Sequence, residues 1–149
     1  MNKGVIFGIL AAAGAAFYFL RGKKDLVNQL EVNIIDLNFD RKKSAEQLFL
    51  MLFFNVRLKL NNPTSGTLLI KQIYIVLYVD GKKAGTINKT DDFNIKANSN
   101  TIVNFTAQVL TANLADSLLR VIQTRENFQL RAQGYIETSF GRIPFEKNF

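Results

Sequence analysis

The chain has 149 residues, of which 48% are hydrophobic, and a formal net charge of +7. This length and composition suit one folded domain with an appendage. The sequence contains no Cys and no His, which excludes disulfide bonds, thiol chemistry, His-ligated metal sites and His acid–base catalysis.

The basic excess lies mainly near the N-terminus. Lys3, Arg21, Lys23 and Lys24 account for more than half of the net charge, because all 12 acidic residues follow residue 24. These basic residues flank an apolar segment. We therefore expect a membrane surface, rather than nucleic acid, as the partner of this region.

Residues 4–20 form the apolar segment, which contains no charged residue. Its length lies at the short end of the range for a single membrane span. Arg21, Lys23 and Lys24 follow as a basic collar that would stop transfer and contact lipid headgroups. Residues 1–24 are therefore predicted to be a transmembrane anchor. The residues expected in the bilayer include Gly4, Val5, Ile6, Phe7, Gly8, Ile9, Leu10, Phe17, Tyr18, Phe19 and Leu20.

Two other interpretations of this segment stay open. Lys3 and the run of small residues also fit a cleaved signal peptide, although residues 17–20 extend the apolar run beyond the alanines. A helix buried in the core is the second alternative. The orientation of an anchor is also open, since basic residues lie on both sides of the segment.

Small residues recur every four positions in this segment, at Gly4, Gly8, Ala12 and Ala16. Such a stripe would let a second helix approach closely and would support self-association. Small residues are also common in spans that do not associate, so both interpretations stand.

The next region begins with alternating apolar residues. They occupy even positions from Leu30 to Ile34 and odd positions from Ile35 to Phe39. Because side chains alternate between the faces of a strand, a β-bulge at residues 34–35 would return both sets to one face. Arg41–Ser44 are predicted to form a solvated basic turn, with a lipid-headgroup contact as the alternative.

Two long strands are predicted in the middle of the chain. Apolar residues occupy the even positions over residues 50–60, and Pro63 should end this strand because it cannot donate to a ladder. Residues 68–79 are apolar on both faces, which predicts a central strand. Asp80–Gly81 predict a hairpin turn into a strand at residues 84–87.

The last third contains a polar stretch, two further strands and a helix. Residues 101–109 predict a strand, and Thr111 is the expected N-cap of an amphipathic helix over residues 114–122 that covers one end of the sheets. Residues 128–137 predict another strand, which turns into a short closing strand at residues 143–146.

These strands recur about every ten residues, with Gly, Pro, Asn or Asp between them. The spacing predicts an all-β fold for residues 25–149. We expect an antiparallel, seven-stranded immunoglobulin- or fibronectin-like β-sandwich with one short helix, preceded by the transmembrane helix.

Several of these features together resemble the group 2 late-embryogenesis-abundant domain, also called the water-stress and hypersensitive-response (WHy) type. The resemblance covers about residues 25–149. It implies a sandwich that often follows one N-terminal membrane anchor, and a role in binding, stress protection or lipid contact without catalytic residues. The matching residues are Leu58–Pro63, Leu68–Ile70, Ile73–Gly81, Gly85, Ala97–Ser99, Gly134, Gly141 and Pro144.

The sequence offers no catalytic or metal-binding pattern. No Ser lies in a nucleophile elbow, and no Gly-rich loop precedes a helix. Asp91–Asp92 lack a third ligand at useful spacing and are predicted to lie in a solvated loop. We therefore expect no enzyme, no cofactor, no metal, no nucleic acid and no small-molecule substrate.

Three functions stay open. The first is a non-catalytic, membrane-anchored binding or structural module, whose partners are the bilayer and a protein or a second copy. The second is a structural subunit of a membrane-associated assembly, such as a membrane-containing virion or an envelope complex. The third is a carrier of lipids or apolar ligands, with a cavity lined by Phe54, Val56, Tyr74, Val76 and Phe105.

Overall fold

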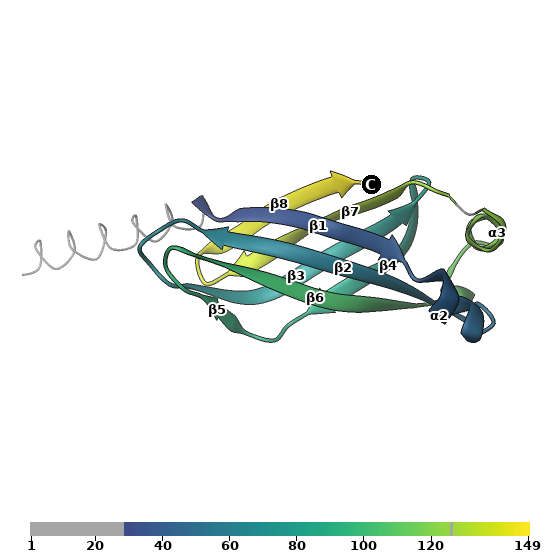
Figure 1. Cartoon of the computed structure of the whole chain (residues 1–149), viewed down its shortest axis with the longest axis horizontal. Coiled ribbons are helices and arrows are strands. Elements are labelled where there is room, and N and C mark those ends of the chain that lie inside the picture. Colours follow the sequence, from purple (N-terminus) through teal and green to yellow (C-terminus); the bar gives the residue numbers. More distant parts are fainter. Residues whose placement is uncertain (1–28, 126) are drawn as a thin grey trace, which may run out of the picture.

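The computed structural model describes residues 29–125 and 127–149. Its strands form two antiparallel sheets that pack face to face (Figure 1). One sheet has three strands in the order β1-β2-β6. The other has five, in the order β4-β3-β7-β8 with β5 beside β3. The strands are β1 (Glu31–Phe39), β2 (Met51–Asn62), β3 (Leu68–Val79), β4 (Lys82–Lys89), β5 (Phe93–Ile95), β6 (Ser99–Leu110), β7 (Leu130–Thr138) and β8 (Gly141–Asn148).

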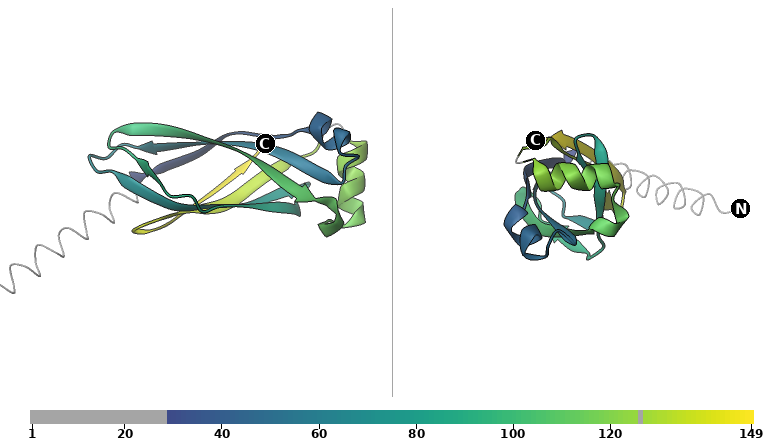
Figure 2. Two further views of the ribbon diagram at one scale, coloured as in Figure 1. Left: turned by 90° about the horizontal axis from the view of Figure 1, so that it is seen from below. Right: turned by 90° about the vertical axis from the view of Figure 1, so that its right-hand side faces the viewer.

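Three short helices gather at one end of the sandwich (Figure 2). The chain enters β1 at the opposite end, and the nine residues of this strand span roughly 30 Å. The helical end is therefore separated from the start of the domain by about one strand length. The helices are α2 (Arg41–Glu46), the 3-10 helix η1 (Thr111–Asn113) and α3 (Asp116–Thr124).

The core lies between the two sheets and follows from period-two alternation. Even positions of β2 from Leu52 to Leu60 are at most 1% exposed, as are the odd positions of β3 from Ile73 to Val79. Burying one large apolar side chain stabilises a fold by about 1.5–3 kcal/mol. Among the described residues this core begins at Leu30.

The predicted bulge in β1 is confirmed. The β1–β2 register shifts between Ile34 and Asp36. The extra residue Ile35 projects outward and is 40% exposed, whereas Leu37 returns to the core at 5% exposed. The bulge thereby places both apolar sets of β1 on the inner face.

The two predicted strand ends in the middle of the chain are also confirmed. β2 ends immediately before Pro63. β3 ends at the hairpin to β4, where Asp80 and Gly81 have φ angles of 46° and 78°. Aspartate and glycine tolerate this left-handed backbone better than other residues, which explains why this dipeptide forms the turn.

Asn62 closes β2 with a side chain that is only 1% exposed. Its Nδ2 donates toward the carbonyls of Gly66 (2.7 Å), Lys96 (3.2 Å) and Ile95 (3.3 Å). Its Oδ1 accepts from the backbone N–H of Thr64 (3.2 Å) and from the Thr64 hydroxyl (2.7 Å). One amide thus connects the end of β2, the β2–β3 turn and the segment that follows β5.

The sequence-based count of seven strands is wrong for the described residues, which contain eight. The additional strand is β5, which pairs with Leu68–Ile70 of β3. Its Ile95 is fully buried. The surrounding polar residues concealed this strand, because three residues are too few to show an alternating pattern.

The basic turn predicted at Arg41–Ser44 is also wrong, since these residues begin α2. Asp40 caps this helix, because its Oδ1 accepts the N–H of Lys43 at 3.0 Å. The hydroxyl of Ser44 donates to the Asp40 carbonyl at 2.7 Å and accepts the N–H of Phe53 at 3.1 Å. Ser44 is therefore fully buried between α2 and β2.

The amphipathic helix at one end of the sandwich is confirmed as α3, which buries Leu118 and Ile122. Its predicted cap is wrong. Thr111 lies in η1, and its hydroxyl donates to the Leu50 carbonyl at 3.1 Å. The N-cap of α3 is Ala115, which provides no side-chain hydrogen bond.

Candidate binding surface

The predicted anchor lies outside the described residues. This applies to residues 4–20, to the small-residue stripe within them, and to the collar of Arg21, Lys23 and Lys24. Within residues 29–125 and 127–149, no helix is long and apolar enough to cross a membrane.

The proposed ligand cavity between the sheets is contradicted. Phe54 and Val56 are buried at 0% and 1% exposed, and point into a packed core. Tyr74 and Val76 lie on the opposite face of β3, which points outward. Since the odd positions of β3 face the core, these two residues and Phe54 cannot line one cavity.

The outer face of β3 is covered by side chains rather than by a further layer. Tyr74 stacks on Tyr135 of β7 with ring centroids 5.3 Å apart. The guanidinium of Arg142 lies 4.5 Å from the centre of the Tyr135 ring, and that of Arg131 lies 4.2 Å from the centre of the Tyr78 ring. Cation–π contacts of this kind explain how a central strand with two apolar faces is accommodated at a surface.

The helical end of the sandwich exposes three large apolar side chains. Leu48 is 80% exposed, Leu50 is 69% exposed and Leu110 is 53% exposed. Leu48 and Leu50 lie in the loop between α2 and β2, and Leu110 is the last residue of β6, opposite Met51. We call these three leucines the end surface.

The backbone of this loop has an unfavourable conformation. Leu48 and Phe49 have φ angles of 50° and 55°. This left-handed region costs roughly 1–2 kcal/mol for each residue with a Cβ. Phe49 packs against the core, whereas Leu48 projects into solvent. Strained backbone in folded proteins is concentrated at functional sites.

Hydrogen bonds hold the loop in this conformation. The N–H groups of Leu48 and Leu50 donate to the carbonyls of Ala45 and Gln47, both at 2.9 Å. The Leu50 carbonyl accepts the Thr111 N–H at 3.2 Å as well as the Thr111 hydroxyl. The leucines are therefore presented on a bonded loop.

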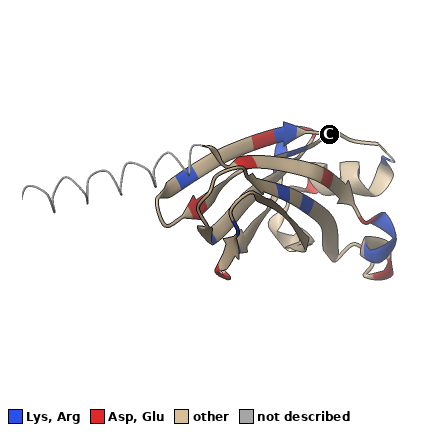
Figure 3. Cartoon of the chain, turned by 60° about the vertical axis from the view of Figure 1, so that its left-hand side comes forward, with Lys and Arg blue, Asp and Glu red and all other residues tan. Residues whose placement is uncertain are grey.

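Arg41 ties α2 to α3 beside the end surface. Its guanidinium donates to the carbonyls of Ile122 (3.0 Å), Gln123 (3.2 Å) and Arg125. These are carbonyls at the C-terminus of α3, where a positive charge is favourable. Basic residues of α2 lie at the same end of the domain (Figure 3), and Lys42 is exposed among them.

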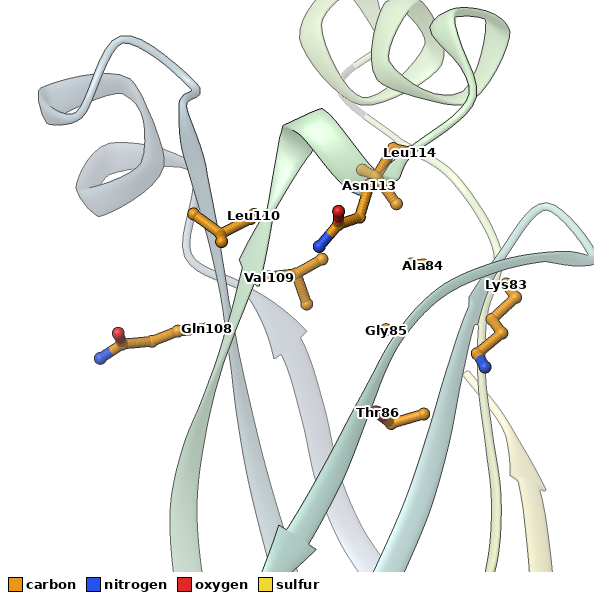
Figure 4. Close-up of a pocket in the computed structure, with 9 residues that line it drawn as sticks. All are labelled: Lys83, Ala84, Gly85, Thr86, Gln108, Val109, Leu110, Asn113 and Leu114. Carbon is orange, nitrogen blue, oxygen red and sulfur yellow. The ribbon is translucent and has the colours of Figure 1, made fainter.

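A groove of about 470 Å³ adjoins the end surface, between the edges of β4 and β6. Figure 4 shows Val109 pointing from β6 toward Gly85 on β4, with Asn113 and Leu114 above them. A Cβ at Gly85 would collide with the Val109 side chain, so glycine permits this close approach. Leu110 belongs to the end surface and also lines the groove.

The described residues contain no cluster of metal ligands. Among them, no group of three or more His, Cys, Asp or Glu is placed to hold a metal ion. The predicted solvated loop contains Asp91, which is 83% exposed and pairs with Lys89 at 3.1 Å. The end surface, with its exposed leucines, is therefore the candidate site.

Sequence reasoning missed the end surface. That reasoning placed Leu50 on the core face of its strand. The strand β2 begins only at Met51, so Leu50 lies beyond the end of the sandwich. A usable signal was present, since residues 48–54 are seven consecutive apolar residues. A strand with one solvated face needs only every second residue to be apolar.

Two packed antiparallel sheets define this protein as an all-β sandwich domain with short end helices. A profile for late embryogenesis abundant protein matches residues 57–148, more than half of the chain. The chain therefore belongs to the late embryogenesis abundant protein family.

Two solved structures share this fold. A solution structure of a protein from Arabidopsis thaliana is 15% identical with a TM-score of 0.59, over 80% of this chain and 77% of that one. A solution structure described as a late embryogenesis abundant protein is 13% identical with a TM-score of 0.51, over 99% and 85%. No curated protein sequence matches the chain.

Proposed function

We propose that this late embryogenesis abundant domain is a non-catalytic, membrane-anchored binding module. Residues 4–20 hold the chain in a bilayer, and Arg21, Lys23 and Lys24 contact the headgroups. The end surface binds a protein partner away from that bilayer. The exposure of Leu48 on left-handed backbone is the observation that carries the proposal.

The chemistry of this position argues for binding. Leu48 combines two unfavourable features, a strained backbone and an apolar side chain in water. Packing among the described residues does not require leucine there, because four-fifths of its surface is exposed. Partner binding would bury this side chain and offset the unfavourable exposure.

The shape of the domain supports an anchor at one end and a binding surface at the other. β1 begins at one end of the sandwich, and the end surface lies at the other (Figure 1). An anchor that precedes residue 25 would thus leave the end surface pointing away from its own bilayer.

Finer assignments form part of this proposal. They are the WHy type, the immunoglobulin- or fibronectin-like classification and a single-pass membrane location. The second candidate is a structural subunit of a membrane-associated assembly, such as a virion or an envelope complex. The uncharged edge of β6, described below, favours it by offering the chain a way to associate with itself.

Removal of residues 1–24 tests the anchor. We expect the shortened chain to leave the membrane fraction and to keep a β-sheet far-UV circular dichroism spectrum with cooperative unfolding. The control replaces residues 4–20 with an unrelated apolar span, which should keep the chain in the membrane. An unfolded shortened chain would mean that the removed segment belongs to the core.

A photoreactive amino acid at position 48 tests the end surface. In the full chain, expressed in its own host, we expect a discrete cross-linked protein product from this position. The matched control is position 59, an exposed lysine on the outer face of β2. Equal products from both positions, or none from position 48, would refute the assignment.

A further inference from the structure

Five strands lie at sheet edges among the described residues. One of them, β5, is only three residues long, and three of the other four carry features that oppose pairing with another chain. Unpaired backbone groups at a sheet edge can bind a further strand, and natural edges are protected by charges, proline and bulges. The protecting features are the bulge at Ile35 with Glu31 and Asp36 on β1, Lys82, Lys83 and Lys89 on β4, and Arg142, Pro144, Glu146 and Lys147 on β8.

The fourth edge, β6, carries none of them. Its twelve residues, Ser99–Leu110, include no charged residue, no proline and no glycine. Its register with β2 is continuous from the pair Met51–Leu110 to the pair Asn62–Ser99. β6 is therefore a long, regular and uncharged edge, which is the type of edge most suited to strand addition.

The direction of its free hydrogen-bonding groups follows from the alternation. The N–H of Thr111 donates to the Leu50 carbonyl on the β2 side. Because backbone groups alternate along a strand, odd-numbered residues of β6 face β2. Even-numbered residues, among them Ile102, Asn104 and Thr106, direct their N–H and C=O groups to the free edge.

The sandwich is also incompletely closed along this edge. Val103 and Phe105 point inward from β6 but are only half-buried. Their partners on β2, Leu58 and Val56, are 0% and 1% exposed. A strand added beyond β6 would cover these two apolar side chains.

We propose that two copies of this chain pair through β6, antiparallel about a twofold axis near Asn104. The pairing joins two three-stranded sheets into one of six strands. It uses residues 101–107 and stops before Val109, where β4 closes the side of the sandwich. Val103 of one copy then lies opposite Phe105 of the other, on the inner face.

Charge favours a second copy of this chain as the partner that pairs with the free edge of β6. Residues 25–149 contain 15 basic and 12 acidic residues, a net charge of +3, so like charges oppose association of two copies through their charged strands. β6 brings no like charges together, because it has no charge to bring. A twofold axis makes the interface self-complementary, so one uncharged strand is sufficient to build it.

The absence of cysteine in the sequence makes a direct test possible with the purified full chain in mild detergent. Single substitutions Ile102→Cys, Asn104→Cys and Thr106→Cys are oxidised and analysed on non-reducing gels. We expect the most disulfide-linked dimer from Asn104→Cys, which faces its own copy across the axis at a separation that suits a disulfide.

The matched control is Ile35→Cys, at the other edge of the same sheet, with 40% exposure against 46% for Ile102. We expect Ile35→Cys to give only the cross-linking of random collisions. Cross-linking at the three β6 positions that does not exceed this control would overturn the proposal. All four positions are exposed, so folding should be preserved, as far-UV circular dichroism would verify.

A charge-insertion variant provides the second measurement. Ile102→Lys combined with Thr106→Lys places lysines opposite each other across the axis. We expect this variant to be monomeric by light scattering, and Ile35→Lys to stay dimeric. A dimer that persists in the double variant would assign association to another surface, such as the small-residue stripe, and would overturn pairing through β6.

Discussion

Replacing Asn62 with alanine should destabilise the domain by about 3–5 kcal/mol, since each net hydrogen bond contributes roughly 0.5–1.5 kcal/mol. The Asn62 amide is 1% exposed and lies near three carbonyls, although its two hydrogens satisfy two of them at a time. Its oxygen accepts two further hydrogen bonds from Thr64. Alanine removes all four and leaves buried polar groups of the β2–β3 turn without this partner.

Urea denaturation followed by far-UV circular dichroism would measure the difference. Asn61→Ala is the matched control, because the neighbouring side chain makes one exposed hydrogen bond, to Glu31 at 2.9 Å. We expect Asn61→Ala to cost less than about 1 kcal/mol. Equal losses of unfolding free energy for the two variants would refute the role of the Asn62 side-chain hydrogen bonds. They would show that asparagine acts here only through its backbone preference.

Three further changes follow from the same structure. Leu48→Asn should stabilise the domain by about 0.5–1 kcal/mol, because asparagine tolerates left-handed backbone better; a loss of stability would contradict the strain. Gly134→Ala should cost more than about 1–3 kcal/mol, because its Cβ would collide with the Tyr74 carbonyl on β3, whereas Gln133→Ala should have little effect in the same denaturation assay. Arg41→Gln should cost about 1–2 kcal/mol by releasing the end of α3, and a thermal midpoint equal to that of the wild type would refute the cap.

Pairing through β6 has a geometric consequence for an anchored chain. Antiparallel strands run in opposite directions, so the two copies would enter β1 from opposite ends of the dimer. If residues 4–20 anchor each copy, the dimer would join two facing bilayers. Each end surface would then point toward the bilayer of the other copy.

Local structure was predictable where a short stretch of sequence determines it. The change of parity at Ile34–Ile35 required a bulge, and the bulge is present. Pro63 and the Asp80–Gly81 pair fixed the ends of β2 and β3 through backbone chemistry alone. These features depend on steric preferences within a few residues, which any tertiary environment must respect.

Features that depend on distant residues were not predictable in this way. The helix at Arg41–Glu46 is completed by Ser44, which accepts a hydrogen bond from Phe53 of β2. The exposure of Leu50 depends on where the sandwich ends. The cover over Tyr74 on the outer face of β3 comes from Tyr135, which stacks on it, and from Arg142 over the Tyr135 ring, and these residues lie on two other strands.

By itself, the sequence determined an all-β antiparallel domain, its long strands and their turns, because alternation and turn residues act locally. Only the tertiary structure decided which apolar residues stay in water and which sheet edge stays unprotected. Leu48 is exposed, and β6 lies at an edge, because of what packs beside them. Neighbours in space, unlike neighbours in the chain, are set by the whole fold.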